Sequence, residues 1–181
     1  MFFHFLSIFV FILGIKINAM DLLKEKEKGD QHFFEKWDFV SDQVMGGVSD
    51  GSAKLISDKK ITFLNLNGVV STKNNGGFIQ IRKTISTEKK YEGIRLKVRG
   101  TNDRYFVHVR TKSLFLPWQY YSADFQPLNS WSEIEIKFDD FKKSNFYQPS
   151  SFSSEDIKSV GFVAFGKDFN ANLDVLEASL F

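Results

Sequence analysis

The chain contains no cysteine, which excludes disulfide bonds, thiolate metal sites, iron–sulfur clusters and a cysteine nucleophile. Only 3 of its 181 residues are proline, so long polyproline linkers are not expected. An excess of one charge is also lacking, because 24 basic and 22 acidic residues leave a formal net charge of +2. Nucleic-acid-binding proteins normally carry a clear basic excess, so this balance argues against nucleic acid as a partner.

Catalytic and cofactor motifs are lacking too. There is no Gly-x-Ser-x-Gly nucleophile elbow, and 46–48 (Gly-Gly-Val) lacks the spacing of a dinucleotide-binding or phosphate-binding loop. No cluster of His, Asp and Glu has the spacing of a zinc or iron site. The sequence therefore predicts a protein that is not an enzyme and that uses neither a cofactor nor a metal.

What the chain does have is aromatic residues and period-two alternation. Aromatic residues make up 16% of the sequence, with 21 phenylalanines, and flat side chains favour pleated, half-buried surfaces. No window keeps a helical period, and 138–141 and 153–157 predict only single helical turns. This pattern predicts an all-β fold, a β-sandwich or jelly roll. Strands are expected at 61–66, 78–85, 91–100, 104–110, 120–125, 131–138, 158–165 and 173–180.

The N-terminal segment differs from the rest. Residues 2–15 are almost entirely apolar, but this run is shorter than the roughly 20 residues of a membrane span. Its length and the small residue Ala19 fit a signal peptide over residues 1–19, which predicts export to a periplasm, a lumen or the medium. Because no Lys or Arg precedes the apolar run, an uncleaved membrane anchor is the alternative. Residues 20–32 are expected to form a charged linker before one domain at 33–181.

Two glycine-rich segments, 41–51 and 74–78, are expected to be shaped loops between strands. Glycine permits a positive φ angle or a close approach of backbones, and Asp side chains bind nearby backbone amides. We favour this turn-capping role for both aspartates of the first loop over a Ca²⁺ site, which would use the same carboxylates. The predicted structural residues are Asp42, Gly46, Gly47, Asp50, Gly76 and Gly77.

The order of motifs identifies a resemblance. Trp37-Asp38 is followed by the segments 41–49 (SDQVMGGVS), 74–82 (NNGGFIQIR) and 121–125 (YSADF), and then by Trp131. In this order, over roughly residues 34–180, the chain resembles the NADH:ubiquinone oxidoreductase complex I intermediate-associated protein 30 family. The resemblance implies a galactose-binding-domain-like jelly roll without a family-wide catalytic site. It also implies an assembly or chaperone-like role on a protein partner, with a membrane complex among the candidates.

The polar face of the middle strands is the candidate binding surface. If these strands are neighbours, their outward side chains form a cationic surface edged by aromatic rings, which suits stacking and hydrogen bonding to sugars. The planar fork of arginine also suits carboxylates and phosphates. A carbohydrate-binding module is therefore the alternative to a protein-binding module. The candidate residues are Arg82, Arg99, His108, Arg110, Trp118, Tyr120 and Asp124.

Two further alternatives concern the same region. His108 is the one strand histidine, and with Asp124 it gives a third hypothesis, a hydrolase, which would still need a nucleophile and an oxyanion hole. The apolar loop 114–118 either presents a partner-binding patch or folds under to close one end of the sandwich.

Overall fold

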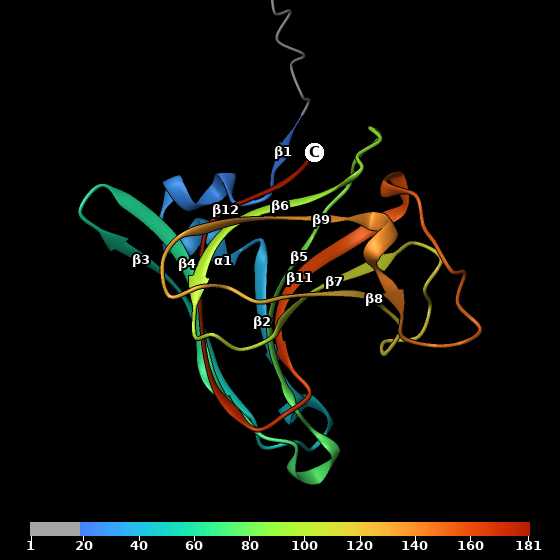
Figure 1. The fold of residues 1–181 in the computed structure, drawn as a ribbon, viewed down its shortest axis with the longest axis horizontal. Coiled ribbons are helices and arrows are strands. Elements are labelled where there is room, and N and C mark those ends of the chain that lie inside the picture. Colours follow the sequence, from blue (N-terminus) through green and yellow to red (C-terminus); the bar gives the residue numbers. More distant parts are fainter. Residues whose placement is uncertain (1–18) are drawn as a thin grey trace, which may run out of the picture.

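A computed structural model describes residues 19–181 and shows two antiparallel sheets packed face to face (Figure 1). Sheet A consists, in order, of β3 (Asp50–Asp58), β4 (Ile61–Val70), β12 (Phe169–Leu180), β6 (Gly93–Gly100) and β9 (Ser132–Lys137), and β1 (Met20–Asp21) pairs with β12. Sheet B consists of β10 (Lys142–Lys143), β8 (Tyr121–Phe125), β7 (Tyr105–Thr111), β11 (Ile157–Phe165), β5 (Phe78–Thr84) and β2 (Trp37–Ser41). The predicted all-β sandwich is confirmed.

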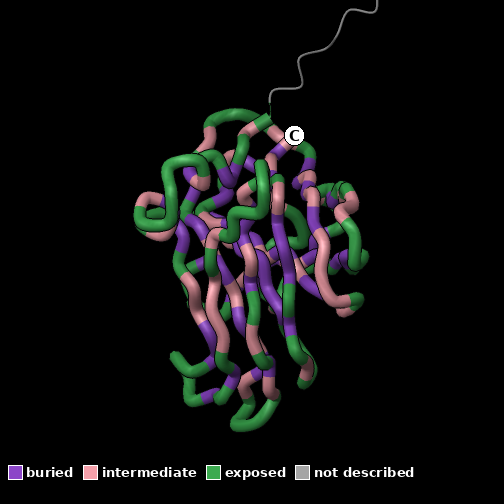
Figure 2. Tube along the Cα trace, turned by 90° about the vertical axis from the view of Figure 1, so that its left-hand side faces the viewer, coloured by how far each residue is buried: buried purple, intermediate pink, exposed green. Residues whose placement is uncertain are grey.

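The core lies between the sheets because each strand turns alternate residues inward. In β6, Ile94, Leu96 and Val98 are fully buried, as the alternation predicts. Figure 2 shows such buried positions along the strands and exposed ones in the loops at both ends. Each large apolar side chain removed from water contributes about 1.5–3 kcal/mol, so this shared core dominates the stability of the fold.

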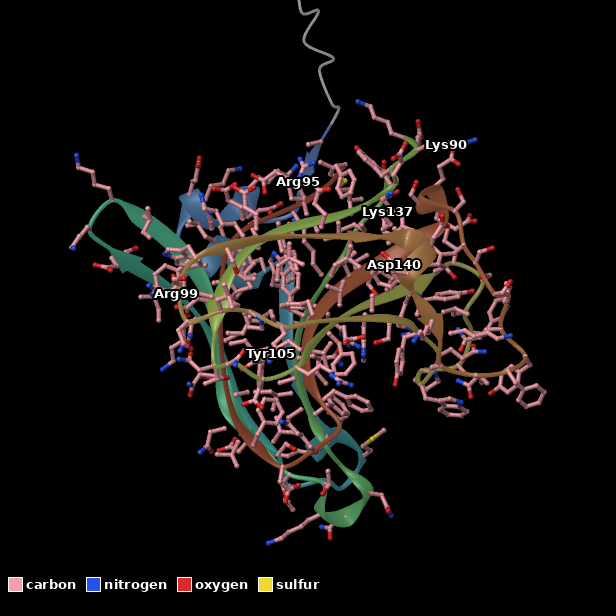
Figure 3. All side chains as sticks on the ribbon, viewed as in Figure 1. Lys90, Arg95, Arg99, Tyr105, Lys137 and Asp140 are labelled. Carbon is pink, nitrogen blue, oxygen red and sulfur yellow. The ribbon has the colours of Figure 1, made fainter. Side chains whose placement is uncertain are left out.

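Tyr105 connects the two sheets through a polar contact inside this core. Its ring is fully buried between the sheets, where Figure 3 labels it. The phenol oxygen lies 2.6 Å from Thr101 Oγ1 and accepts a hydrogen bond of 2.9 Å from the backbone N–H of Asn172 in β12. Burial raises the pKa of this phenol, so it stays a neutral partner in the core.

Four strands lie outside the segments that alternation identifies: the two-residue strands β1 and β10, and the longer strands β2 and β3. Strand β3 is an edge strand with its residues mostly exposed or half-buried, so its sequence carries little apolar periodicity. Strand β2 begins at the buried Trp37, whose ring stacks between Phe33 and Phe162 at centroid distances of 5.6 Å each. Phe33 belongs to the short helix α1 (Asp30–Phe34), so this stack fastens the helix to sheet B.

The remaining helical elements are single 3-10 turns. They are η1 (Lys24–Lys28), η2 (Asp42–Met45), η3 (Lys73–Asn75), η4 (Phe138–Asp140) and η5 (Ser154–Asp156). The last two coincide with the two helical turns that the sequence predicts. Within residues 19–181, none of the helices has the length and apolar character to cross a membrane. The expected signal peptide or anchor falls on residues 1–19, of which 1–18 lie outside the described part.

Residues 20–32 differ from the solvated linker that their charge pattern predicts. Leu22 and Leu23 are fully buried, and β1 pairs with the last strand. Glu25 forms a buried ion pair with Lys83 of β5, with 2.6 Å between Oε2 and Nζ. Burial raises the pKa of Glu25, but the hydrogen bond and positive charge of Lys83 outweigh it and hold the pKa below its usual value. Within the described part of the chain, the packed domain therefore includes residues from Met20 onward.

Asp42 joins the two glycine-rich loops. Its carboxylate is fully buried and accepts hydrogen bonds from the N–H groups of Ser49 (2.8 Å) and Phe78 (3.2 Å) and from that of Gly77. Burial raises its pKa, yet the Ser49 hydroxyl and these backbone donors lower it below the usual range. A Cβ atom at Gly47 would lie 2.3 Å from the Asp42 carboxyl carbon, so a side chain there is excluded.

We predict that Asp42→Ala lowers the free energy of unfolding by at least about 2 kcal/mol, because it leaves several buried N–H groups without an acceptor. Asp50→Ala is the matched control, since Asp50 is exposed at the start of β3, directly after the first of these loops, and it should cost less than about 0.5 kcal/mol. Urea unfolding at pH 7 measures both. Equal destabilisation by the two substitutions would contradict the role of Asp42.

Candidate functional site

A groove lies on the outer face of sheet B, over β5, β11 and β7, with a volume of about 230 Å³. Strand β5 supplies Phe78, Gln80 and Arg82, β11 supplies Ser159, Val163 and Phe165, and β7 supplies His108 and Arg110. The loops add Met45, Asn75, Gly76, Pro117, Trp118 and Tyr120. Five of the seven candidate binding residues predicted from the sequence therefore come together: Arg82, His108, Arg110, Trp118 and Tyr120.

The strand register explains why the surface is hollow there. In β11, Gly161 lies opposite Arg82 of β5 on one side and His108 of β7 on the other. A Cβ atom at Gly161 would stand 3.3 Å from the Arg82 Cβ and 3.5 Å from Gln80 Oε1. Since glycine has no side chain, no atom rises from the sheet between Arg82 and His108 at this position.

An aromatic pair forms one wall. The rings of His108 and Tyr120 stack with centroids 4.1 Å apart and an interplanar angle of 14°. Phe165 meets the His108 ring from β11 in an edge arrangement at 6.0 Å. Trp118 continues this side, and its side chain is 55% exposed, so a flat indole ring is presented to solvent at the groove.

His108 is held neutral. Its Nε2 atom is buried and has no hydrogen-bond partner among the described residues. Burial lowers its pKa to about 3, because the charged imidazolium would lose its hydration beneath the neighbouring rings. The ring therefore contributes an uncharged aromatic side chain to the groove at neutral pH.

Arg110 organises the loop that carries Trp118. Its Nε donates to the carbonyl oxygen of Gln119 at 3.1 Å, and its Nη2 donates to that of Leu116 at 3.0 Å. Gln119 is itself buried and accepts from the Leu116 N–H at 2.9 Å. Burial, together with the positive charge of Arg82, lowers the pKa of Arg110. The guanidinium thus holds the loop in place while it also lines the groove.

Arg82 and Gln80 have a different status. Both side chains are half-buried in the groove, and neither makes a hydrogen bond or ion pair with another described residue. All the ion pairs found within residues 19–181 lie elsewhere in the molecule. The hydrogen-bond donors of Arg82 and the donors and acceptor of Gln80 are therefore free to bind a ligand.

Two predicted site residues are placed elsewhere. Arg99 belongs to β6 of sheet A, where it pairs with Asp174 at 2.8 Å and its guanidinium lies 4.5 Å from the Trp131 ring centre (Figure 3). The alternation of inward and outward residues correctly predicts that Arg99 points outward, but β6 belongs to sheet A, whereas the groove lies on sheet B. Asp124 does face outward from sheet B, yet it lines a separate hollow and pairs with Arg104 at 3.7 Å.

The glycine-rich loops reach the groove at its other end. Gly46 and Gly77 adopt φ angles of +90° and +127°, a region that favours glycine. Beside them, Met45, Asn75 and Gly76 line the groove. Through this placement the buried Asp42 carboxylate also fixes part of the groove wall.

The hydrolase hypothesis finds no support in this geometry. No hydrogen bond or ion pair between His108 and Asp124 is present in the described chain, since Asp124 lies opposite Phe106 and pairs with Arg104. A histidine with a pKa of about 3 is also a weak general base near neutral pH.

The loop 114–118 combines both of the alternatives considered for it. Leu114 is buried and closes one end of the core, whereas Phe115 is 87% exposed. Leu116 and Trp118 are exposed as well. The loop therefore packs at its start and presents apolar side chains along the rest.

Comparison with known proteins decides the family. The model of the family described as Complex I intermediate-associated protein 30 (CIA30) matches residues 26–175. The chain belongs to this family. The match confirms the resemblance seen in the sequence, and it begins within the N-terminal segment that packs against the sandwich. A search of curated proteins finds no match to this CIA30-family chain.

Solved structures agree on the fold. The family 11 carbohydrate-binding module of the cellulase Lic26A-Cel5E of Clostridium thermocellum superposes with a TM-score of 0.64 at 18% identity, covering 81% of this chain and 87% of that one. The module TmCBM61, in complex with β-1,4-galactotriose, gives a TM-score of 0.53 at 10% identity and covers 90% of this chain and 98% of that one. At these identities the likeness establishes the shared fold of this CIA30-family protein.

Several groove residues escape sequence reasoning. Phe78, Val163 and Phe165 look like ordinary strand residues, and only the strand register shows that they share a face with His108. Gly161 is the residue whose sequence context indicates the groove, because a glycine inside a strand often marks a site where a ligand or another backbone approaches closely. The alternation of apolar and polar residues does not predict the order of the strands, and it is this order that brings these residues together.

The buried His108 makes stability depend on pH. Its folded pKa of about 3 lies below the value near 6.5 of an unfolded histidine, so the unfolded chain binds more protons between those values. The free energy of unfolding should therefore rise with pH across this window, by up to about 1.4 kcal/mol per pH unit from this group, and level off above it. Denaturant unfolding of wild type and His108→Gln at pH 4.5 and 7 should show a smaller difference between the two pH values in the variant.

His32→Gln provides the control, because His32 lies at the surface beside Glu35. It should keep the wild-type pH dependence. An NMR titration in which the His108 ring protonates near pH 6.5 would contradict the buried neutral state.

Proposed function

We propose that this CIA30-family protein is a non-catalytic binding module whose groove on sheet B takes a carbohydrate chain. The observation that carries the proposal is the combination, in one groove, of an exposed indole ring, a stacked His108–Tyr120 pair and side chains with free donors and acceptors. Sugars present two matching chemistries, a ring face with apolar C–H groups and a rim of hydroxyls. The groove offers a complement to each.

The shape supports an extended ligand. The groove reaches from Met45 and Asn75 at the glycine-rich loops to Trp118 at the loop after β7, so its lining spans the length of the strands. The half-buried side chains of Gln80 and Arg82 lie in this lining, and sugar hydroxyls would supply the hydrogen-bond partners that they lack among the described residues. The family 11 module, with the same fold, has been solved in complex with a β-1,3-1,4-mixed-linked tetrasaccharide, which supports the use of this architecture for glycans.

A glycan array followed by calorimetric titration of the best oligosaccharide tests this proposal. Trp118→Ala should weaken binding at least about fivefold, because loss of ring stacking removes ~1 kcal/mol or more. Tyr147→Ala is the matched control, since Tyr147 is 51% exposed but does not line the groove, and its affinity should equal that of the wild type. Absence of binding to every glycan, with folded protein, would refute the carbohydrate function.

A second candidate function is an assembly or chaperone-like role on a protein partner, as the family description suggests. The observation that favours it is a set of exposed aromatic side chains on two loops, here called the aromatic patch: Phe115, Phe146 and Tyr147, which are 87%, 87% and 51% exposed. The two loops that carry the aromatic patch are joined by hydrogen bonds, including one of 3.3 Å from Ser144 Oγ to the Trp118 carbonyl oxygen. Exposed apolar patches of this kind mark protein interfaces.

For this second candidate we predict that the tagged full chain, purified from its native host, brings down a defined set of membrane-complex subunits. The double substitution Phe115→Ser and Phe146→Ser should abolish this association. Leu128→Ser, at a residue that is 55% exposed outside the aromatic patch, should retain it. If mass spectrometry finds the same proteins with all three forms, the aromatic patch is not the partner site.

A further inference from the structure

We propose that the groove is selective for an acidic sugar, one that carries a carboxylate or a sulfate ester, and that Arg82 and Arg110 recognise the negative group. This inference rests on the proposed carbohydrate function and names the class of glycan that the groove selects. It follows from the charges that line the groove.

The lining contains two arginines and no carboxylate. Arg82 lies opposite Gly161, and Arg110 lies opposite Ser159 on the other side of the same strand, so only small residues separate the two cations. Their closeness also shows in the pKa of Arg110, which burial and the charge of Arg82 lower. Two like charges held near each other in a partly desolvated groove are stabilised when an anion lies between them.

Hydrogen-bonding capacity points the same way. Arg110 already donates from Nε and Nη2 to loop carbonyls and keeps its remaining N–H groups for the groove, while the whole guanidinium of Arg82 is free. Arginine donates and never accepts, and a neutral sugar hydroxyl satisfies it less well than a carboxylate or sulfate oxygen. The neutral His108 leaves the positive charge on the two arginines alone.

Neighbouring acids do not neutralise this charge. Asp38 of β2 lies opposite Arg82 in the strand register, but it is exposed and does not form an ion pair with Arg82. Asp124, on β8, is engaged by Arg104 at 3.7 Å. Of the described acidic side chains on this face, none lines the groove, so its positive charge is available to a ligand.

The test uses the full chain and matched trisaccharides in several linkages, each as a neutral form, a C6-carboxylate and a C6-sulfate, with a tetraglutamate peptide as a fourth probe. We expect one or both acidic forms to bind at least about tenfold tighter than the neutral form, with an affinity that falls as salt rises. Comparison of the carboxylate with the sulfate identifies which anion the groove takes.

Substitutions assign the selectivity. Arg82→Gln should reduce the preference for the acidic form to within about threefold while binding of the neutral form persists. Arg104→Gln changes the net charge equally from outside the groove and should keep the full preference. Melting temperatures check that both variants fold; if Arg82→Gln does not, Arg82→Lys, which keeps the charge and loses the planar fork, should lower the preference instead.

Each other outcome overturns the inference in a distinct way. Equal affinity for neutral and acidic forms refutes the selectivity and leaves the carbohydrate function intact. Binding of the glutamate peptide in preference to every trisaccharide refutes both and indicates an acidic protein segment as the ligand. Unchanged preference in the Arg82 variant, with the fold intact, shows that Arg82 does not recognise the negative group and refutes the assignment to the two arginines together.

Discussion

The burial of one face of sheet B against sheet A is the constraint on which the rest of the structure depends. It commits Val107, Val109 and Phe162 to the core and, by the period of two, commits the residues between them to the outer face. His108 and Arg110 are therefore on the groove side as a consequence of how the core is built. A shift of one residue in register would exchange the two sets, so the fold and the site are specified by the same pattern.

The loops use polar contacts where the strands use apolar ones. Asp42 draws the segments after β2 and before β5 together through backbone donors, and Arg110 does the same for the loop after β7 through two carbonyl groups. Both charged groups are desolvated to do so, and both are compensated by hydrogen bonds. The ends of the groove are thereby held by buried or half-buried charges, which gives its walls a defined shape before any ligand arrives.

Much of the fold could be predicted because inward residues repeat along each strand, as in Ile94, Leu96 and Val98. The edge strand β3 and the packed N-terminal segment could not, since one lacks periodicity and the other hides Leu22, Leu23 and Glu25 within a run of charges. For the site, the alternation correctly predicts that Arg82 and Arg99 point outward. It could not tell that they belong to opposite sheets, because sheet membership depends on long-range pairing.

The groove also shows where binding and stability oppose each other. A surface built only for stability would not hold Arg82 and Arg110 near each other without a carboxylate beside them. This arginine pair lies on the outer face of sheet B, whereas on the outer face of sheet A Arg99 pairs with Asp174 and Arg95 pairs with Glu135. The proposed acidic ligand would complete the arginine pair by supplying the negative group that Asp174 and Glu135 supply on sheet A.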